Sequence, residues 1–218
     1  YYSNLADIPY DPKTLDKLNP DWPQGRIYRH EIGKEGADAE KFFDLPLTRL
    51  NEPKMWVPNA WNRRSAAAGI DTDAKGNILV GDLVDQQVVK ISPDGKMLSA
   101  TKVDWPDRLA VSRKTGAIYV ACRRPMDGTP AAELVKIVGR GETGKIVARL
   151  PIGWPAGQSI AVDDSGEKTV IWVAGGDSVL RIEDRGEELA VIGKPANEPN
   201  AIGFVCFGEV DRANEYVY

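Results

Sequence analysis

Apolar and polar residues alternate along three segments of the chain, and the three segments share one order of features. Each has an apolar segment, a turn with glycine, a β-branched segment, a variable loop and a segment that ends in Lys-Ile or Arg-Ile. The segments occupy residues 69–91, 109–137 and 160–182, and the equivalent glycines Gly76, Gly116 and Gly166 are 40 and 50 residues apart. Alternation with a period of two is typical of antiparallel strands, and this repeat length is typical of propeller blades.

The pattern predicts an all-β fold, a β-propeller of four-stranded antiparallel blades. A single blade cannot bury both of its faces, so blades must stack around an axis. We expect repeats at about 66–106, 107–155 and 156–199, two inner strands of a partial blade in 200–218 (202–207 and 215–218), and outer strands in 24–47 (26–32 and 42–47). Residues 1–23 contain four prolines and are expected to form an irregular lead-in.

The two ends leave two arrangements open. The terminal strands could share one blade and close a ring of four blades, which would remove exposed sheet edges. Alternatively, the chain is a partial propeller, an arc of a longer array, and an end in the middle of a blade favours this alternative. The chain begins at Tyr1 without an initiator Met, so we expect a processed or partial chain and a periplasmic or extracellular location.

Composition narrows the classes of partner. The 218 residues carry a net charge of −4, which gives no basic surface for a phosphate backbone, so nucleic acid is not expected. No run approaches 18 apolar residues, so no membrane span is expected. Cys122 and Cys206 lie in apolar segments of different repeats and are expected to be buried free thiols. Trp105 and Trp154 each precede a proline at the start of a repeat and are expected to pack between blades.

Two motifs that suggest ligand sites are better explained as turns. Residues 139–144 fit G-x-G-x-x-G, but the alternating residues 146–150 predict a strand, whereas phosphate binding needs a helix there. The aspartates of residues 71–82 have the spacing of a calcium loop, but Lys75 occupies a ligand position. The chain has one histidine, His30, and two separated cysteines, so zinc sites and Cys–His or Ser–His catalysis lack their residues.

The first repeat resembles the NHL repeat. It has Gly69-Ile70 at its start, Asp73 and Gly76-Asn77 at its turn, and Asp82 after its second strand; residues 88–91 follow as the third. The other repeats depart at the position of Asp82. The resemblance covers about residues 66–207 and implies a six-bladed type of propeller. Members of this superfamily serve as binding platforms, and their relatives include gluconolactonase-like, senescence-marker-type lactonases and lyases.

Oxygen-bearing residues at one mouth of the propeller channel are the first candidate site. Asp107, Gln158 and Asn200 are expected to face one another there, and Pro199-Asn200 resembles the Pro-Asn of the lactonases, which hold a divalent cation with such residues. This alternative function is a metal-dependent lactonase-like hydrolase or lyase with Ca²⁺ or another divalent cation. The competing interpretation is that these side chains hydrogen-bond loop backbones.

Arginines in loops on the same face are the second candidate site. The expected binding surface contains Trp61, Arg63, Arg64, Asp107, Arg108, Arg123, Arg124 and Asn200. Guanidinium groups suit carboxylates, sulfate or a partner protein, although solvated loop arginines would look the same. The function expected is therefore a non-catalytic binding or scaffolding module without a cofactor, whose partner is another protein or the remainder of a larger chain or assembly.

Overall fold

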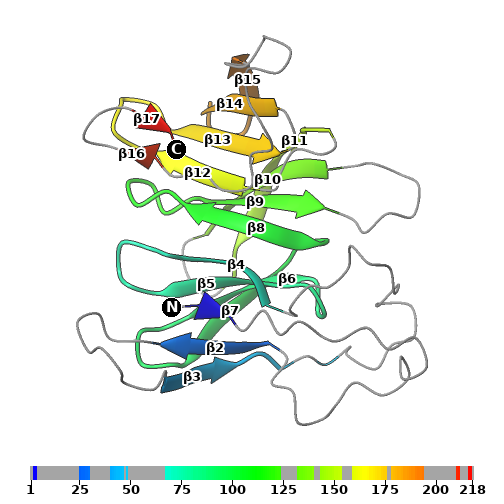
Figure 1. Cartoon of the computed structure of the whole chain (residues 1–218), viewed down its shortest axis with the longest axis vertical. Coiled ribbons are helices and arrows are strands. Elements are labelled where there is room, and N and C mark those ends of the chain that lie inside the picture. The colour runs from blue at the N-terminus through cyan, green and yellow to red at the C-terminus, as the bar shows by residue number, and fades with distance from the viewer. Residues whose placement is uncertain are drawn as a thin grey trace.

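The computed structural model describes residues 2–3, 25–29, 40–46, 48, 67–123, 132–139, 143–153, 159–175, 178–193, 210–211 and 216–217. Within these residues the chain has strands and turns but no helix. The strands form five antiparallel sheets: four follow one another along the long axis of the molecule, and the short β16–β17 sheet lies beside β12 (Figure 1). The predicted all-β class and the four-stranded blades of a partial β-propeller are therefore confirmed.

The middle of the chain forms three sheets of four consecutive strands, which we call blades 1, 2 and 3. From inner to outer strand, blade 1 contains β4 (Ala67–Thr72), β5 (Ile78–Asp82), β6 (Gln87–Ile91) and β7 (Met97–Lys102); blade 2 contains β8 (Pro106–Val111), β9 (Ile118–Arg123), β10 (Ala132–Val138) and β11 (Lys145–Pro151); blade 3 contains β12 (Ser159–Asp163), β13 (Val170–Gly175), β14 (Ser178–Asp184) and β15 (Leu189–Gly193). The inner strands β4, β8 and β12 lie beside one another.

The terminal strands differ from the prediction. β1 (Tyr2–Ser3), β2 (Arg26–Arg29) and β3 (Glu40–Asp44) form one sheet, so the expected irregular lead-in contains a strand. β16 (Val210–Asp211) pairs with β17 (Tyr216–Val217) in a separate sheet. The expected partner of the last strand, residues 202–207, lies outside the described residues. Because the two terminal sheets are separate, the described strands do not share one blade between the chain ends, and the closed four-bladed ring is wrong for them.

Alternation along each strand sends apolar side chains to both faces of a blade. In β5, Leu79 belongs to a core between blades 1 and 2, with Leu109 and Val120. Its neighbours Ile78 and Val80 belong to a core between blade 1 and the β1–β3 sheet. A third core joins blades 2 and 3. Since blades are covered on both sides, their strands are apolar at successive positions, which explains why β5 is buried throughout.

Two glycines let blade 1 approach blade 2 at backbone distance. A Cβ on Gly81 would lie 2.4 Å from the carbonyl oxygen of Pro106, and a Cβ on Gly69 would lie 2.5 Å from the backbone nitrogen of Leu109. Both distances are shorter than any real contact to Cβ. The first repeat therefore needs glycine at these positions because the neighbouring inner strand fills the space that a side chain would occupy.

None of the described residues forms a helix that is long and apolar enough to cross a membrane. The cellular location remains a prediction.

Candidate functional site

The predicted channel face corresponds to the end of each blade where the inner strand begins. In blade 2 the backbone register pairs Pro106 with Cys122 and Arg123 with Ala132. The first residues of β8 and the last of β9 therefore lie at the same end, which we call the mouth end of blade 2 (residues 105–108, 122–123 and 132). Arg108 and Arg123, which the sequence analysis placed on one face, share this end by backbone position.

Asp107 and Arg108 lie at a bulge of β8: Pro106 pairs with Cys122 and Arg108 with Ala121, so Asp107 is an extra residue that interrupts the regular alternation of side chains. Asp107 is 1% exposed, whereas the side chain of Arg108 is 42% exposed. Arg108 Nη1 donates to the Asp107 carbonyl oxygen at 3.2 Å and lies 3.6 Å from Asp107 Oδ1. The two residues expected in a connector are thus part of a strand, and the buried carboxylate lies beside a guanidinium that reaches solvent.

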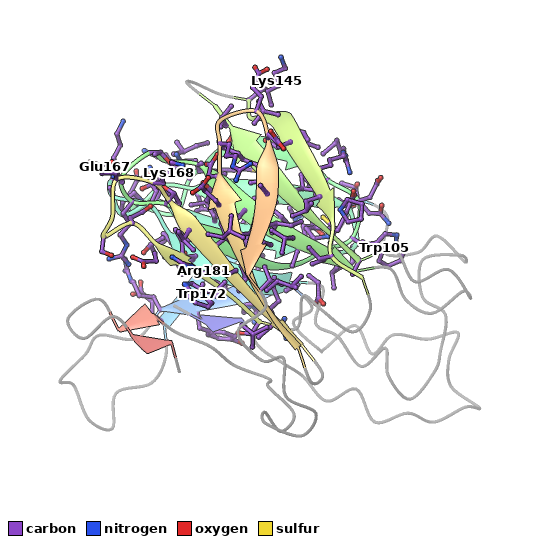
Figure 2. The ribbon with its side chains drawn as sticks, turned by 90° about the horizontal axis from the view of Figure 1, so that it is seen from above. Trp105, Lys145, Glu167, Lys168, Trp172 and Arg181 are labelled. Carbon is purple, nitrogen blue, oxygen red and sulfur yellow. The ribbon has the colours of Figure 1, made fainter. Side chains whose placement is uncertain are left out.

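Trp105 precedes β8 with a left-handed backbone, φ 51°, and a half-buried side chain (Figure 2). Pro106 after it is buried. A positive φ is uncommon outside glycine, so this conformation is held by its surroundings. The expected packing of Trp105 is consistent with this partial burial, while Trp154 lies outside the described residues.

Most of the other predicted site residues cannot be placed. Those outside the described residues are Trp61, Arg63, Arg64, Arg124, Gln158 and Asn200. Arg123 is described by its backbone alone. His30 and Cys206 also lie outside. The structure therefore brings together Asp107, Arg108 and the backbone of Arg123, and the roles of all these residues in binding remain predictions.

The NHL-like aspartate Asp82 stabilises a turn at the mouth end of blade 1. Asp82 Oδ1 accepts hydrogen bonds from the backbone N–H groups of Val84 and Asp85, both at 3.0 Å, and Oδ2 accepts one from Gln87 Nε2 at 3.0 Å. The residue is fully buried, and burial raises the pKa of its carboxyl above the ordinary value. Asp85 in turn accepts from the backbone and hydroxyl of Thr48. The carboxylates of Asp82 and Asp85 therefore have structural roles: they fix the turn after β5 and bind Thr48.

The calcium-like loop is the expected turn. Asp73 accepts hydrogen bonds from the N–H groups of Lys75 and Asn77 and from Asn77 Nδ2, and it pairs with Lys90 Nζ at 2.8 Å. Asp71 Oδ2 accepts from the Val111 N–H of the next blade at 2.8 Å. Across the described part of the chain, no three His, Cys, Asp or Glu residues are grouped so that they could hold a metal ion.

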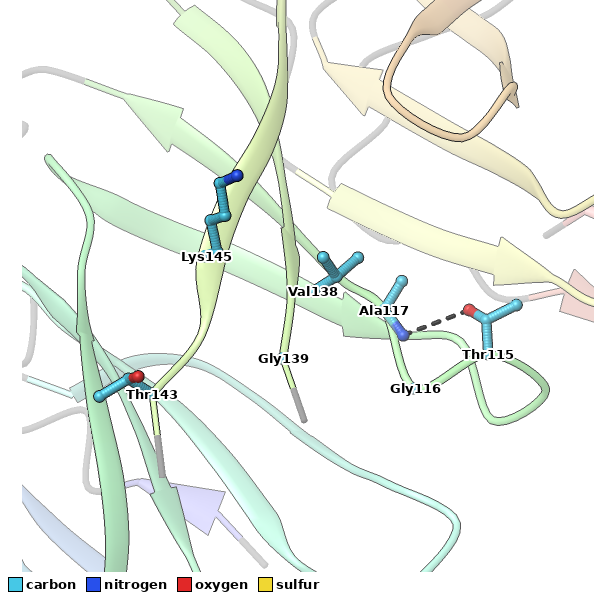
Figure 3. A pocket seen from close by; sticks show the side chains of 7 residues that line it. All are labelled: Thr115, Gly116, Ala117, Val138, Gly139, Thr143 and Lys145. Carbon is cyan, nitrogen blue, oxygen red and sulfur yellow. Dashed lines mark hydrogen bonds between the residues drawn. The ribbon is translucent and has the colours of Figure 1, made fainter. Parts of the chain in front are cut away.

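The glycine-rich motif lies between the antiparallel strands β10 and β11, so a strand follows it, as expected, and not the helix that phosphate binding needs. Beside it, at the end of blade 2 opposite the mouth end, is a shallow pocket of about 360 Å³ (Figure 3). Thr115 Oγ1 accepts from the Ala117 N–H at 3.2 Å and donates to Ser112 Oγ at 2.7 Å. The pocket is lined by Thr115, Gly116, Ala117, Val138, Gly139, Thr143 and Lys145.

Cys122 at the mouth end is buried, as expected, and burial raises the pKa of its thiol. A high thiol pKa leaves little thiolate, so Cys122 is not suited to nucleophilic chemistry.

Sequence analysis did not find the roles of the basic residue in the repeated Lys-Ile or Arg-Ile pair. Lys90 pairs with Asp73 of its own blade, and Lys136 Nζ donates to Asp184 Oδ1 of blade 3 at 2.7 Å. Arg181 instead lies over the ring of Trp172, 5.6 Å from its centroid. A basic residue that recurs inside apolar strands indicates, from the sequence alone, that this position has an acidic or aromatic partner.

No protein-family model matches the chain, and no curated protein sequence matches it. Among solved structures, it is similar to a protein of unknown function from Bacteroides thetaiotaomicron VPI-5482 (TM-score 0.49, 13% identity, 70% of this chain and 38% of the other). It is similar to streptogramin B lyase (TM-score 0.48, 16%, 70% and 47%) and to a protein of unknown function from Bacteroides caccae (TM-score 0.45, 18%, 68% and 56%). The chain thus spans less than two thirds of each of these proteins. At such TM-scores the likenesses identify neither a family nor an activity.

Proposed function

We propose that the chain is a non-catalytic binding module that uses the mouth end of blade 2 to hold an anionic group of a partner protein or small ligand. The observation that carries the proposal is the arrangement of Arg108: its side chain is 42% exposed while its guanidinium is held beside the buried Asp107. An arginine that is already positioned loses less conformational freedom when a carboxylate or sulfate binds.

The position of Arg108 in the fold supports this role. Arg108 belongs to β8, the inner strand of blade 2, which lies between the inner strands β4 and β12. Its backbone is in contact with blade 1, because a Cβ on Gly69 would lie 2.7 Å from the Cα of Arg108. Binding groups on packed strands are placed more accurately than groups on loops. The predicted neighbours Arg63, Arg64, Arg123 and Arg124 would add positive charge at the same end.

The test uses anions of defined chemistry. We expect sulfate and succinate, compared with chloride at equal ionic strength, to raise the midpoint of thermal unfolding of the chain, because a ligand that binds only the native state stabilises it. Sulfate also stabilises proteins without binding a site, so the informative quantity is the difference between variants. Arg108→Gln should lose most of the anion-dependent rise.

Arg149→Gln is the matched control. The Arg149 side chain is 43% exposed on the same blade but is paired with Glu133 on the outer strands. This variant should keep the wild-type anion response. Equal responses from wild type, Arg108→Gln and Arg149→Gln would refute the proposed anion site.

The alternative, a cation held by Asp107, Gln158 and Asn200, has one member among the described residues. Asp107 Oδ1 lies 3.6 Å from the Arg108 guanidinium, whose charge opposes a second cation beside the same carboxylate. Asp107, the one candidate ligand among the described residues, does not form a metal site by itself. A rise of the unfolding midpoint with Ca²⁺ that Asp107→Asn abolishes would favour the alternative function.

A further inference from the structure

Blades 2 and 3 carry the same row of side chains across their strands. In blade 2 the register aligns Ala110, Tyr119, Lys136 and Ala148. In blade 3 it aligns Ala161, Trp172, Arg181 and Gly193. Each row reads small, aromatic, basic, small from the inner to the outer strand. Because register partners point to the same face of a sheet, each row marks one face of its blade.

The row of blade 2 is covered by blade 3, and its polar atoms meet a carboxylate. All four residues are at most 8% exposed. Tyr119 Oη donates to Asp184 Oδ2, and Lys136 Nζ donates to Asp184 Oδ1 at 2.7 Å. The aromatic and basic positions of this row therefore form a binding site for one acidic side chain of the next sheet.

The row of blade 3 has the same chemistry but lacks such a carboxylate among the described residues. Trp172 is half-buried and Arg181 is exposed (Figure 2). The indole N–H of Trp172 is buried and finds no acceptor in the described part of the chain. A buried donor without an acceptor is unfavourable, because the group has lost its hydrogen bond to water. By register, Val170 and Val179 lie on the same face, and both are half-buried.

We propose that this face of blade 3, centred on Trp172 and Arg181, is the seat of the chain's own C-terminal segment, residues 201–218, and that a carboxylate of that segment binds Arg181 and the Trp172 indole. Three observations favour this occupant. β16, which contains Asp211, lies against β12 of blade 3. The chain continues for 25 residues after β15 ends at Gly193, enough to reach across the blade.

The third observation is charge and composition. Residues 201–218 contain three acidic residues and one basic residue, and most of the remaining residues are apolar. The acidic residues are Glu209, Asp211 and Glu215. The face also carries Glu183, which pairs with Lys168 and Arg185. With Arg181, these basic residues outnumber the acidic one, so the excess of acidic residues in 201–218 complements the charge of the face. An acidic residue of this segment would then bind Trp172 and Arg181 of blade 3 as Asp184 binds Tyr119 and Lys136 of blade 2.

The experiment measures hydrogen–deuterium exchange of the full chain by mass spectrometry. Backbone amides in residues 201–218 should be protected in the wild type. Arg181→Glu should speed their exchange about tenfold or more, the effect of losing a hydrogen bond between charged groups. Trp172→Phe keeps an aromatic ring under Arg181 but removes the N–H donor, and it should speed exchange by a smaller factor.

Rescue identifies the contact. In the Arg181→Glu background, charge reversal to Arg at one of the three acidic positions should restore protection. Arg149→Glu, at an exposed arginine of β11, is the matched control and should leave residues 201–218 protected. In every variant, peptides from β4–β10 must exchange as in the wild type, which shows that the blades remain folded.

Three results would overturn the proposal. The first is exchange of residues 201–218 at the rate of an unstructured chain in the wild type. The second is failure of all three charge reversals to restore protection. The third is a concentration-dependent dimer in sedimentation that Arg181→Glu abolishes while exchange of residues 201–218 is unchanged, since the face would then seat a second copy of the chain.

Discussion

The ion pair between Lys136 and Asp184 should be a strong link between blades 2 and 3. Both side chains are 8% exposed, and Nζ lies 2.7 Å from Oδ1. Lys136 Nζ also donates to the carbonyl of Gly186 at 2.6 Å, while Asp184 accepts from the N–H of Gly186 and from Tyr119. At an effective dielectric constant of about 20 the gross attraction at this distance is about 6 kcal/mol, and desolvation of the two charges offsets much of it.

We predict that removing one partner costs far more than removing both. Lys136→Met leaves the Asp184 carboxylate buried without its cation, and Asp184→Asn leaves the ammonium without its anion. Each should lower the free energy of unfolding by about 3–5 kcal/mol. In the double variant no charge is stranded, so its loss should be smaller than the sum of the single losses by about 2–3 kcal/mol.

Urea denaturation of the four proteins of this cycle, followed by circular dichroism, measures the coupling. Because neighbouring units of a repeat array stabilise one another through their interfaces, the single variants should also broaden the transition. The control is a second cycle on Glu133 and Arg149, which pair within blade 2 at 27% and 43% exposure. Exposed pairs couple by about 0.2–1 kcal/mol. Equal coupling in the two cycles would refute the reasoning that the Lys136–Asp184 pair is a desolvated link.

Three further predictions follow from single residues. Gly69→Ala should destabilise the chain by about 1–3 kcal/mol through a clash with the β8 backbone, whereas Gly166→Ala, whose Cβ would meet nothing closer than 3.7 Å, should be nearly neutral in the same urea assay. In a Cys206→Ser background, Cys122 should react with a thiol reagent only as the chain unfolds, because burial raises its pKa; rapid labelling of the native chain would contradict this. Burial also raises the pKa of Asp82, so the folded state binds the carboxyl proton of Asp82 more tightly than the unfolded state does. The stability gained from this proton is present below the ordinary aspartate pKa of 3.8 and is lost as the pH rises through the raised pKa. The unfolding free energy of wild type relative to Asp82→Asn should therefore fall as the pH rises through this range, and a constant difference would contradict the assignment.

The sequence predicts at which end of a blade the candidate residues lie, but it does not predict which of their side chains are buried. The repeat places Arg108 and Arg123 at one end of a blade because each strand follows the last by a short turn, which fixes the end at which a residue lies. It does not fix which side chain is buried. Asp107 is 1% exposed and its neighbour Arg108 is 42% exposed, and Asp107 is the extra residue of a bulge in the pairing of β8 with β9, which redirects side chains locally. The register that selects the sides depends on pairing with β9.

The sequence by itself determined the β class, the four-stranded blades and the turns. These depend on local physics: a period of two, glycine at positive φ as in Gly76 and Gly116, and a side chain such as Asp73 that binds its own turn. Only the tertiary structure decided what the repeated basic residue does. Lys136 and Arg181 stand at the same position of their blades, yet Lys136 is buried against a carboxylate and Arg181 is exposed over Trp172. The difference arises because burial and charge pairing belong to the sheet that packs against a strand, and the strand's own pattern does not contain that sheet.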